Sequence, residues 1–434
     1  MYFPAEPAKK TEMQPDSFAN LKGRRRWILV FLTFWLVFLT VAVNVEMTNL
    51  QSKSEIPLPF GITSSHGEVL AQDFAYNVLF FKGVRDGLVK HPYRMEEQEE
   101  MMRQILPGMP TGMIHGYSPV AFILMLPLLG FPGQAIYLIY TTLCVIGIIL
   151  LFKIYLLPRS EAPLQLLALT VCAVSVWLTS TFATGQSSIF TTTILGGFWC
   201  LLQRREKTSP LHVDLLIAVL FWMICLKPSV AIVPAMLLLG SRAWRVLVIG
   251  VALLIVTWIF CARYYGGCWG GVSDYLHLLN HYHSGDFTPY FRGAGGDAQA
   301  QYWSDLHFSI ERNLILFVSL ILVVLRWMRH LSGSEHFQGM VWVFLLLSPY
   351  LMPTENWVLC LLVVEGSFFQ SNRGFLFYGK LLLLMGIFDL RLGLTSSMEV
   401  EYQLKWLLFL WMVFEWFHAR MTQTLPKFNH ASLS

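Results

Sequence analysis

Residues 27–45 have the sequence WILVFLTFWLVFLTVAVNV, which contains no charged side chain. About 20 apolar residues in a helix cross the hydrocarbon core of a bilayer, so this stretch is long enough for a span. Residues 46–118 are polar, and most of the chain from residue 119 to residue 419 is apolar again. The sequence therefore predicts a membrane-embedded protein with one long polar region directly after its first span.

The composition of the whole chain supports the same class. The 434 residues are 55% hydrophobic and 13% charged, whereas a soluble globular chain carries roughly 25% charged residues. The mean hydropathy is +0.54. The net charge of +4 is small and does not indicate a nucleic-acid partner. We therefore expect an all-α, polytopic transmembrane protein of about 12 spans, at 27–45, 134–154, 163–181, 187–203, 211–226, 229–240, 245–262, 309–326, 338–350, 356–370, 374–391 and 403–419.

The basic loops predict the orientation of these spans. Residues 1–26 are polar and end in a basic cluster with no cleavage site after the apolar run, so we expect a cytoplasmic tail followed by a retained helix. Every later loop on the same side is basic, as are the final residues 420–434, which we place in the cytoplasm. Residues 27–419 then form one integral membrane domain. The basic residues are Lys153, Arg159, Arg204, Arg205, Lys207, Arg242, Arg245, Arg326, Arg329, Arg373, Arg420 and Lys427.

This topology places two large regions outside the cytoplasm, at 46–133 and 263–308. The apolar run 119–131 is short for a crossing, and counting it as a span would invert every later loop. We expect it to form a re-entrant or juxtamembrane helix. Cys261 and Cys268 are the two cysteines that could face an oxidising compartment together, and their spacing leaves a disulfide open.

Asp73 is the carboxylate of most interest, because it lies among aromatic residues in the first outward region. We expect it to lie at the centre of an active site at a membrane face, with Tyr76 nearby. Two structural alternatives remain. Asp73 could be only the N-cap of a helix, and residues 74–89 could form a solvated amphipathic helix lying on the membrane, with Phe74, Val78 and Phe81 on its apolar face.

Other polar residues on the outward face are further candidates for the site. Lys227 interrupts an apolar stretch before a proline, which predicts a broken helix with an ammonium aimed at an anion, although a lysine there could also extend to the interface. Arg292 and Arg263 suit phosphate, because a guanidinium matches phosphate oxygens. The remaining candidates are His115 and Tyr117, which could also be interfacial belt residues, together with Gln186, Glu355 and Asn356.

A metal site is a weaker hypothesis. His281, His283 and Asp286 lie close together in the second outward region, but their spacing matches no strong zinc signature.

Together these residues resemble the integral membrane C-type (GT-C fold) glycosyltransferases that use polyprenyl-phosphate sugars. Within that group they resemble the bacterial polyprenyl-phosphate-mannose-dependent α-mannosyltransferases. The resemblance runs from about residue 70 to about residue 370 and rests on an ordered set of short motifs. These are Asp73-Phe74 with Tyr76, Tyr117-Ser118-Pro119, Gly185-Gln186-Ser187, Lys227-Pro228 and Ser348-Pro349. After Ser348-Pro349, where members of that family have a histidine, this chain has Thr354-Glu355-Asn356-Trp357.

The resemblance implies a GT-C-like fold with juxtamembrane helices in the large first extracytoplasmic loop. It implies transfer of a mannose-like hexose from a polyprenyl-phosphate donor to a lipid- or glycan-linked acceptor, with inversion at the anomeric carbon. Asp73 would be the general base, and Lys227 with Arg292 or Arg263 would stabilise the departing phosphate. No cofactor is expected, because the donor lacks the pyrophosphate that usually requires a metal. The site would lie on the extracytoplasmic face of the cell membrane.

Two other functions fit a polytopic chain. A transporter or flippase of a lipid-linked glycan should carry charged residues through the centres of its spans, whereas here they gather at one face. A non-catalytic membrane scaffold would leave Asp73 and Lys227 without a role.

Overall fold

The computed structural model describes residues 72–105, 116–156, 187–205, 209–281, 298–347, 358–365, 380, 382–384, 387 and 398–424. Within these residues the chain is helical and contains no strand, which confirms the predicted all-α class. The elements are α2 (Gln72–Arg85), α3 (Met95–Ile105), α4 (Pro119–Met125), η1 (Leu126–Leu128), α5 (Gly133–Leu156), α8 (Ser188–Arg204), α9 (Leu211–Ile224), α10 (Pro228–Gly240), α11 (Trp244–Cys261), α12 (Cys268–His281), α13 (Ala298–Trp327), α14 (Gly333–Leu347), α15 (Leu359–Glu365) and α17 (Met398–Thr424).

The helices α5, α8, α9, α10, α11, α13, α14 and α17 each overlap a span predicted from the sequence. In the described part of the chain one helix, α11, is both long and apolar enough to cross a membrane. Only 22% of the residues of α11 are buried by the rest of the protein, so most of its side chains are at least partly uncovered. The predicted spans 27–45 and 163–181 lie outside the described residues, and the count of about 12 spans stays a prediction.

The apolar run 119–131 forms a short helix, as predicted. α4 begins at Pro119 and continues into the single turn of η1. The hydroxyl of Ser118 caps α4 by accepting a hydrogen bond from the backbone N–H of Val120, and proline is favoured at the first helical position, where its missing N–H is not needed. Ten helical residues are too few to cross a bilayer.

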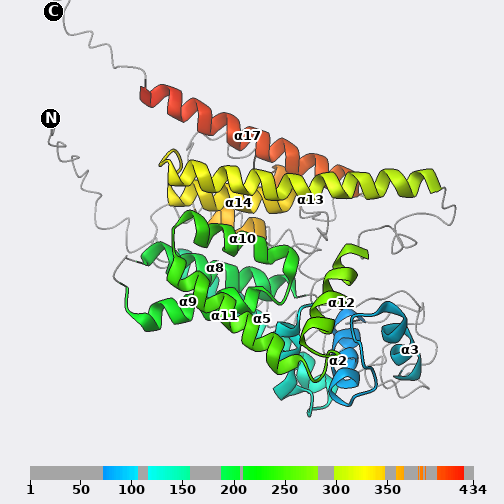
Figure 1. Ribbon diagram of the computed structural model, residues 1–434. Helices are drawn as coiled ribbons and strands as arrows, with labels where there is room; N and C mark the ends of the chain where they lie inside the picture. Colours follow the sequence, from blue (N-terminus) through cyan, green and yellow to red (C-terminus); the bar gives the residue numbers. More distant parts are fainter. Residues whose placement is uncertain are drawn as a thin grey trace, which may run out of the picture.

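The helices pack in two groups joined by α10 (Figure 1). α8, α9 and α11 pack together on one side of α10, and α13 and α14 pack side by side on the other. α17 lies against α14, and α2, α3 and α12 gather at one end of the bundle. Gly250 of α11 contacts the ring of Phe221 of α9 so closely that a Cβ atom would not fit. Such small residues allow the close approach that is typical of helices packed in membranes.

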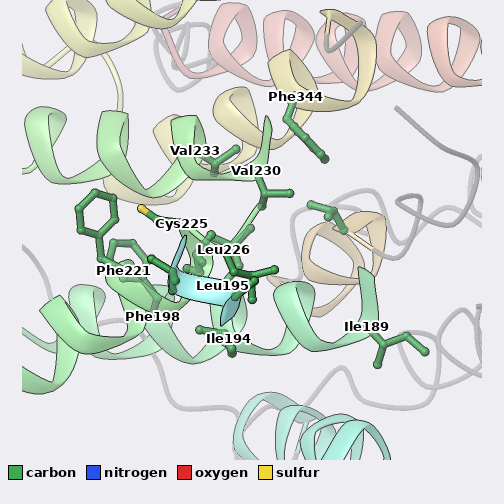
Figure 2. Close-up of a cluster of buried hydrophobic side chains, with 14 of the residues drawn as sticks. Ile189, Ile194, Leu195, Phe198, Phe221, Cys225, Leu226, Val230, Val233 and Phe344 are labelled. Atoms are coloured by element: carbon green, nitrogen blue, oxygen red, sulfur yellow. The ribbon is translucent and has the colours of Figure 1, made fainter. Parts of the chain in front are cut away.

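The core lies where α8, α9, α10 and α14 meet (Figure 2). Leu195 and Phe198 of α8, Val230 and Val233 of α10, and Phe344 of α14 are all buried there. Cys225 and Leu226, which join α9 to α10, are buried in the same cluster. The connection between these two helices is therefore held rigidly by packing on several sides.

The idea of a solvated amphipathic helix at residues 74–89 is wrong. The helix itself forms, as α2, but its buried residues are not confined to one stripe, and the described residues Asn77, Lys82 and Arg85 are partly buried. α2 packs against α3, α4 and α5, which removes its apolar side chains from solvent. The buried residues are Phe74, Tyr76, Val78, Leu79, Phe80, Phe81 and Val84.

Candidate functional site

Ser118 joins the segment before α4 to the connection between α9 and α10. Its backbone N–H donates a hydrogen bond to the carbonyl oxygen of Leu226 at 3.1 Å. Its hydroxyl donates to the carbonyl oxygen of Cys225 at 2.6 Å. The carbonyl groups at the end of a helix need partners outside that helix, and Ser118 supplies one for each of the two residues that follow α9. The motif Tyr117-Ser118-Pro119 is thus bound directly beside Lys227-Pro228.

The break between α9 and α10 follows from Lys227-Pro228. Proline at position 228 has no N–H to donate, and it disfavours helical geometry in the residue before it. Lys227 accordingly has extended backbone angles, with φ of −115° and ψ of 102°, and it is the N-cap of α10. The broken helix predicted from the sequence is confirmed. The side chain of Lys227 is half-buried.

Tyr117 connects this break to the start of α8. Its phenolic oxygen lies 3.0 Å from the hydroxyl oxygen of Ser187, so the two groups share a hydrogen bond. Ser187 immediately precedes α8 and directly follows Gln186 in the sequence. The structure therefore brings together three motifs that are far apart in the chain, at Tyr117-Ser118-Pro119, Ser187 and Lys227-Pro228.

Tyr93 also holds the backbone of Tyr117. The hydroxyl of Tyr93 donates a hydrogen bond to the carbonyl oxygen of Tyr117 at 3.1 Å. The ring of Tyr93 stacks on Tyr265, with ring centroids 4.9 Å apart, and also contacts Tyr275 at 4.7 Å. Burial of Tyr93, with further contributions from Tyr265 and Tyr275, raises its pKa well above the ordinary value. Tyr93 therefore remains protonated and able to donate.

Charged residues fasten the first outward region to the second. Asp274 of α12 lies 3.1 Å from Nδ1 of His91 and 3.3 Å from Nε of Arg94. The carboxylate of Glu97 accepts hydrogen bonds from the backbone N–H groups of Lys90 and His91, at 3.2 Å and 2.8 Å. The turn that carries Tyr93 is thereby fixed against α12.

Gly266 allows this close approach of the two regions. Its φ is +71°, and a Cβ atom at this position would lie 2.5 Å from Nδ1 of His91. A side chain here would be strained by the backbone conformation and would also collide with the imidazole.

Asp73 is the second residue of α2. Because α2 begins before Asp73, this residue lies in the first turn and not at the N-cap position that was the alternative. Its side chain lies outside the described residues.

Tyr76, predicted to contact the donor, is buried in the core formed by α2. Arg263 is exposed, stacks over the ring of Tyr264 at 4.5 Å and donates to its hydroxyl at 2.6 Å.

Several predicted site residues lie outside the described part of the chain. These are His115, Gln186, Arg292, Glu355 and Asn356, and also His283 and Asp286 of the metal hypothesis. His281 ends α12, but its side chain is outside the described residues as well. The described residues contain no cluster of side chains that could hold a metal ion. Cys261 and Cys268 are free thiols and do not form the disulfide that the sequence left open.

Sequence reasoning missed the positioning role of Tyr93. The signal was an excess of aromatic residues in both outward regions, at Tyr93 in one and at Tyr264 and Tyr265 in the other. Aromatic side chains outside a span need a partner to bury them, and those of the two regions bury each other.

The sequence of the chain is similar to a known protein family. The model of glycosyltransferase family 87 matches residues 115–351, which is more than half of the chain. The matched range includes Tyr117, Ser187 and Lys227 and begins after Asp73. Neither the curated proteins nor the solved structures gave a match.

Proposed function

The chain belongs to glycosyltransferase family 87, a family of GT-C-type membrane glycosyltransferases, and from this premise we propose its substrates and mechanism. The proposed reaction moves a mannose-like hexose from a polyprenyl-phosphate donor to a lipid- or glycan-linked acceptor. The proposed site lies at the extracytoplasmic face of the cell membrane, within one integral membrane domain at 27–419 and between cytoplasmic tails.

The observation that supports this site most strongly is the meeting of three motifs around Tyr117. Ser118 binds the carbonyl groups of Cys225 and Leu226, and the hydroxyl of Tyr117 contacts Ser187. Lys227 and the backbone next to Gln186 are therefore held at the same end of the bundle. A lysine at a helix break is suited to the phosphate of a lipid-linked donor, and the Gln186 amide is proposed to bind the donor as well.

Asp73 is the proposed general base. The acceptor hydroxyl attacks the anomeric carbon and loses its proton to the Asp73 carboxylate, while the bond from that carbon to the phosphate oxygen breaks. Such a base typically accelerates a reaction by about 10²–10⁴. The proposal is supported by the position of α2, which packs against α4, the helix that begins at the Tyr117-Ser118-Pro119 motif.

Lys227 is the proposed cation for the leaving phosphate. Breaking the bond to the sugar leaves additional negative charge on the phosphate oxygens, and a fixed cation stabilises that charge in the transition state. Arg292 or Arg263 is proposed as the second cation. Arg263 supports this role because its stacking on Tyr264, which in turn packs on Phe122 of α4 at 5.0 Å, fixes the guanidinium near the same end. His115, Tyr117, Gln186, Glu355 and Asn356 remain proposed contacts of the donor.

The proposed orientation is supported by the distribution of charge. The helix α10 runs from Lys227 at the site end to Arg242 beyond its other end. At that other end Arg205 and Arg245 both pair with Asp214, at 2.7 Å and 3.2 Å. Basic residues gather on the cytoplasmic side of membrane proteins, which favours an extracytoplasmic position for the site.

Transfer can be separated from transport by an assay in detergent. Purified protein in micelles is incubated with a panel of radiolabelled polyprenyl-phosphate sugars and a lipid acceptor extract. A transferase forms labelled product without a sealed compartment, whereas a flippase cannot be detected under these conditions. Label transferred only from polyprenyl-phosphate mannose supports the proposal. A parallel incubation contains the corresponding radiolabelled nucleotide sugars, and transfer from a nucleotide sugar alone would contradict the proposed donor.

A further inference from the structure

Arg242 and Arg329 have a backbone conformation that normally belongs to glycine. Their φ angles are 56° and 62°, and they are the two non-glycine residues with positive φ among the described residues. Each follows the end of a helix, with Arg242 after α10 and Arg329 after α13. A left-handed residue at this position is usually glycine, because a Cβ atom is strained there.

The hydrogen bonds identify both turns as the same capping motif. Beyond α10, the N–H of Ala243 donates to the carbonyl of Leu238 at 2.9 Å. Beyond α13, the N–H of His330 donates to the carbonyl of Leu325 at the same distance. This long-range bond, with the left-handed residue just before the donor, defines the Schellman motif. The chain thus carries arginine at two positions where glycine would be less strained.

The two turns lie side by side around Trp327. The indole N–H of Trp327 donates to the carbonyl oxygen of Leu239 at 2.9 Å, which ties the end of α13 to the end of α10. The guanidinium carbon of Arg242 lies 5.7 Å from the centre of the Trp327 ring, and Trp244 contacts the same ring at 6.4 Å. Arg242, Arg329 and both tryptophans are exposed. We refer to Arg242, Arg329, Trp244 and Trp327 as the Arg242–Arg329 patch.

Among the described residues, no acidic side chain neutralises the positive charge of the patch. Elsewhere at this end the structure pairs arginines with carboxylates, as in Arg205 with Asp214 and Arg420 with Glu335. In the part of the chain that the structure describes, no carboxylate forms an ion pair with Arg242 or Arg329. One of these exposed guanidinium groups, that of Arg242, lies over the Trp327 ring, and Arg329 is exposed in the neighbouring turn, two residues after Trp327.

The helix α11 indicates where the patch sits relative to a bilayer. It begins at Trp244 and has 18 residues, which corresponds to about 27 Å at 1.5 Å per residue and matches the hydrocarbon thickness. Beyond Arg245 in its first turn, its exposed side chains, such as Val248, Ile255 and Ile259, are apolar. With α11 in the hydrocarbon, Trp244 and the Arg242–Arg329 patch lie at the level of the lipid headgroups.

We propose that the Arg242–Arg329 patch binds the phosphate group of an anionic phospholipid. A guanidinium donates paired hydrogen bonds to phosphate oxygens, and tryptophan is favoured at the boundary between acyl chains and headgroups. This lipid is separate from the proposed sugar donor, because the patch lies at the opposite end of α10 from Lys227. The inference does not depend on the proposed sugar or acceptor.

Glycine substitution tests the proposal without disturbing the fold, because glycine relieves the left-handed strain. The full-length protein and an Arg242→Gly, Arg329→Gly variant are compared in micelles supplemented with phosphatidylglycerol, phosphatidylcholine or inorganic phosphate, and thermal unfolding is measured. We expect phosphatidylglycerol to raise the Tm of the wild type by several degrees more than phosphatidylcholine. The glycine variant should lose that additional shift while keeping a Tm in phosphatidylcholine at or above that of the wild type.

Control variants distinguish lipid binding at the patch from a general effect of removing positive charge. Arg204→Gln removes an exposed arginine at the same end, outside the patch, and should keep the full phosphatidylglycerol shift. An Arg242→Gln, Arg329→Gln variant retains the backbone strain and should also lose the shift, so the test remains valid if glycine impairs folding. An unchanged shift in both double variants would overturn the proposal. An equal shift from inorganic phosphate would also overturn it, because the site would then bind the free anion rather than a lipid.

Discussion

The phenolic oxygen of Tyr117 lies 3.0 Å from the hydroxyl oxygen of Ser187, across 70 residues of sequence. With the bonds of Ser118 to the carbonyl groups of Cys225 and Leu226, this contact assembles the end of the bundle at which we place the transferase site. Each of these contacts can be tested by substituting the residues that form it.

The Tyr117–Ser187 contact should appear as a coupling energy. Tyr117→Phe and Ser187→Ala each remove one hydroxyl, and the loss of one hydrogen bond costs about 0.5–1.5 kcal/mol. Because both variants break the same contact, the double variant should cost less than the sum of the two. The measurement is a double-mutant cycle on the free energy of unfolding in micelles. Additive effects would show that the hydroxyl groups do not interact.

Replacing Lys227 should slow transfer far more than it weakens the fold. We expect Lys227→Met to lower kcat by about 10²–10³, the effect of removing one group that stabilises charge in a transition state. Lys227→Arg should recover part of that loss because the positive charge remains. Lys90→Met changes an exposed lysine in the first outward region and should leave kcat unchanged. A wild-type kcat for Lys227→Met would remove Lys227 from the mechanism.

Glu335 should make the stability of the bundle depend on acid pH. It precedes the predicted span 338–350 and forms a capping box, accepting from the N–H of Ser332 at 2.6 Å while its own N–H donates to the Ser332 hydroxyl at 3.2 Å. Burial alone would raise the pKa of Glu335, but hydrogen bonds from Trp416, Ser332 and Arg420 outweigh it and lower the pKa to about 2.

The consequence is a loss of stability in acid. Because the pKa in the folded state is lower than the ordinary value of 4.5, the ionised group stabilises the fold above that pH. This contribution is lost as the pH falls from 4.5 towards 2. Glu335→Gln should therefore be less stable than wild type at neutral pH, and the difference should shrink over this range. The check is urea unfolding of both proteins at a series of pH values, and parallel curves would contradict the assignment.

Gly266→Ala should weaken the contact between the two outward regions. The left-handed backbone costs an alanine about 1–2 kcal/mol, and its Cβ atom would lie 2.5 Å from Nδ1 of His91. We expect lower thermal stability and faster hydrogen exchange at residues 90–94. Gly270→Ala has open space around its Cβ, so it is the matched control and should show neither change.

The proposed orientation predicts opposite labelling of two engineered cysteines. Lys90 and Arg204 are both exposed, one at the site end of the bundle and one at the other end. With Cys268 replaced, Lys90→Cys should react with an impermeant maleimide in intact cells and Arg204→Cys only after lysis. Labelling of both from the same side would contradict the topology.

The sequence predicted the helices better than their packing. The helix break at Lys227-Pro228 could be predicted, because proline acts on its neighbouring residues through local backbone chemistry. The short helix that begins at Pro119 could also be predicted, because the apolar run 119–131 is too short to cross a bilayer. The burial of α2 could not, because its partners α4 and α5 come later in the chain and its sequence pattern shows only that it is helical.

The residues of the candidate site could likewise be predicted better than the contacts between them. Tyr117, Ser187 and Lys227 were found as motifs, but their meeting depends on hydrogen bonds between side chains and backbone carbonyl groups of distant segments. The contact of Tyr93 with the carbonyl of Tyr117 could not be predicted either, because any hydroxyl in the outward regions could have served. Such contacts are set by tertiary packing, which the local sequence does not encode.

The most direct test of the proposed mechanism is the transfer rate of Asp73→Asn. Asparagine keeps the shape of the side chain but cannot accept the proton of the acceptor hydroxyl. Asp86→Asn is the matched control, because Asp86 is an exposed carboxylate just beyond the same helix, where it pairs with Arg85 at 2.7 Å. With polyprenyl-phosphate mannose in micelles, we predict a fall of about 10²–10⁴ in kcat for Asp73→Asn and an unchanged kcat for Asp86→Asn. Equal and undiminished transfer by both variants would contradict the account.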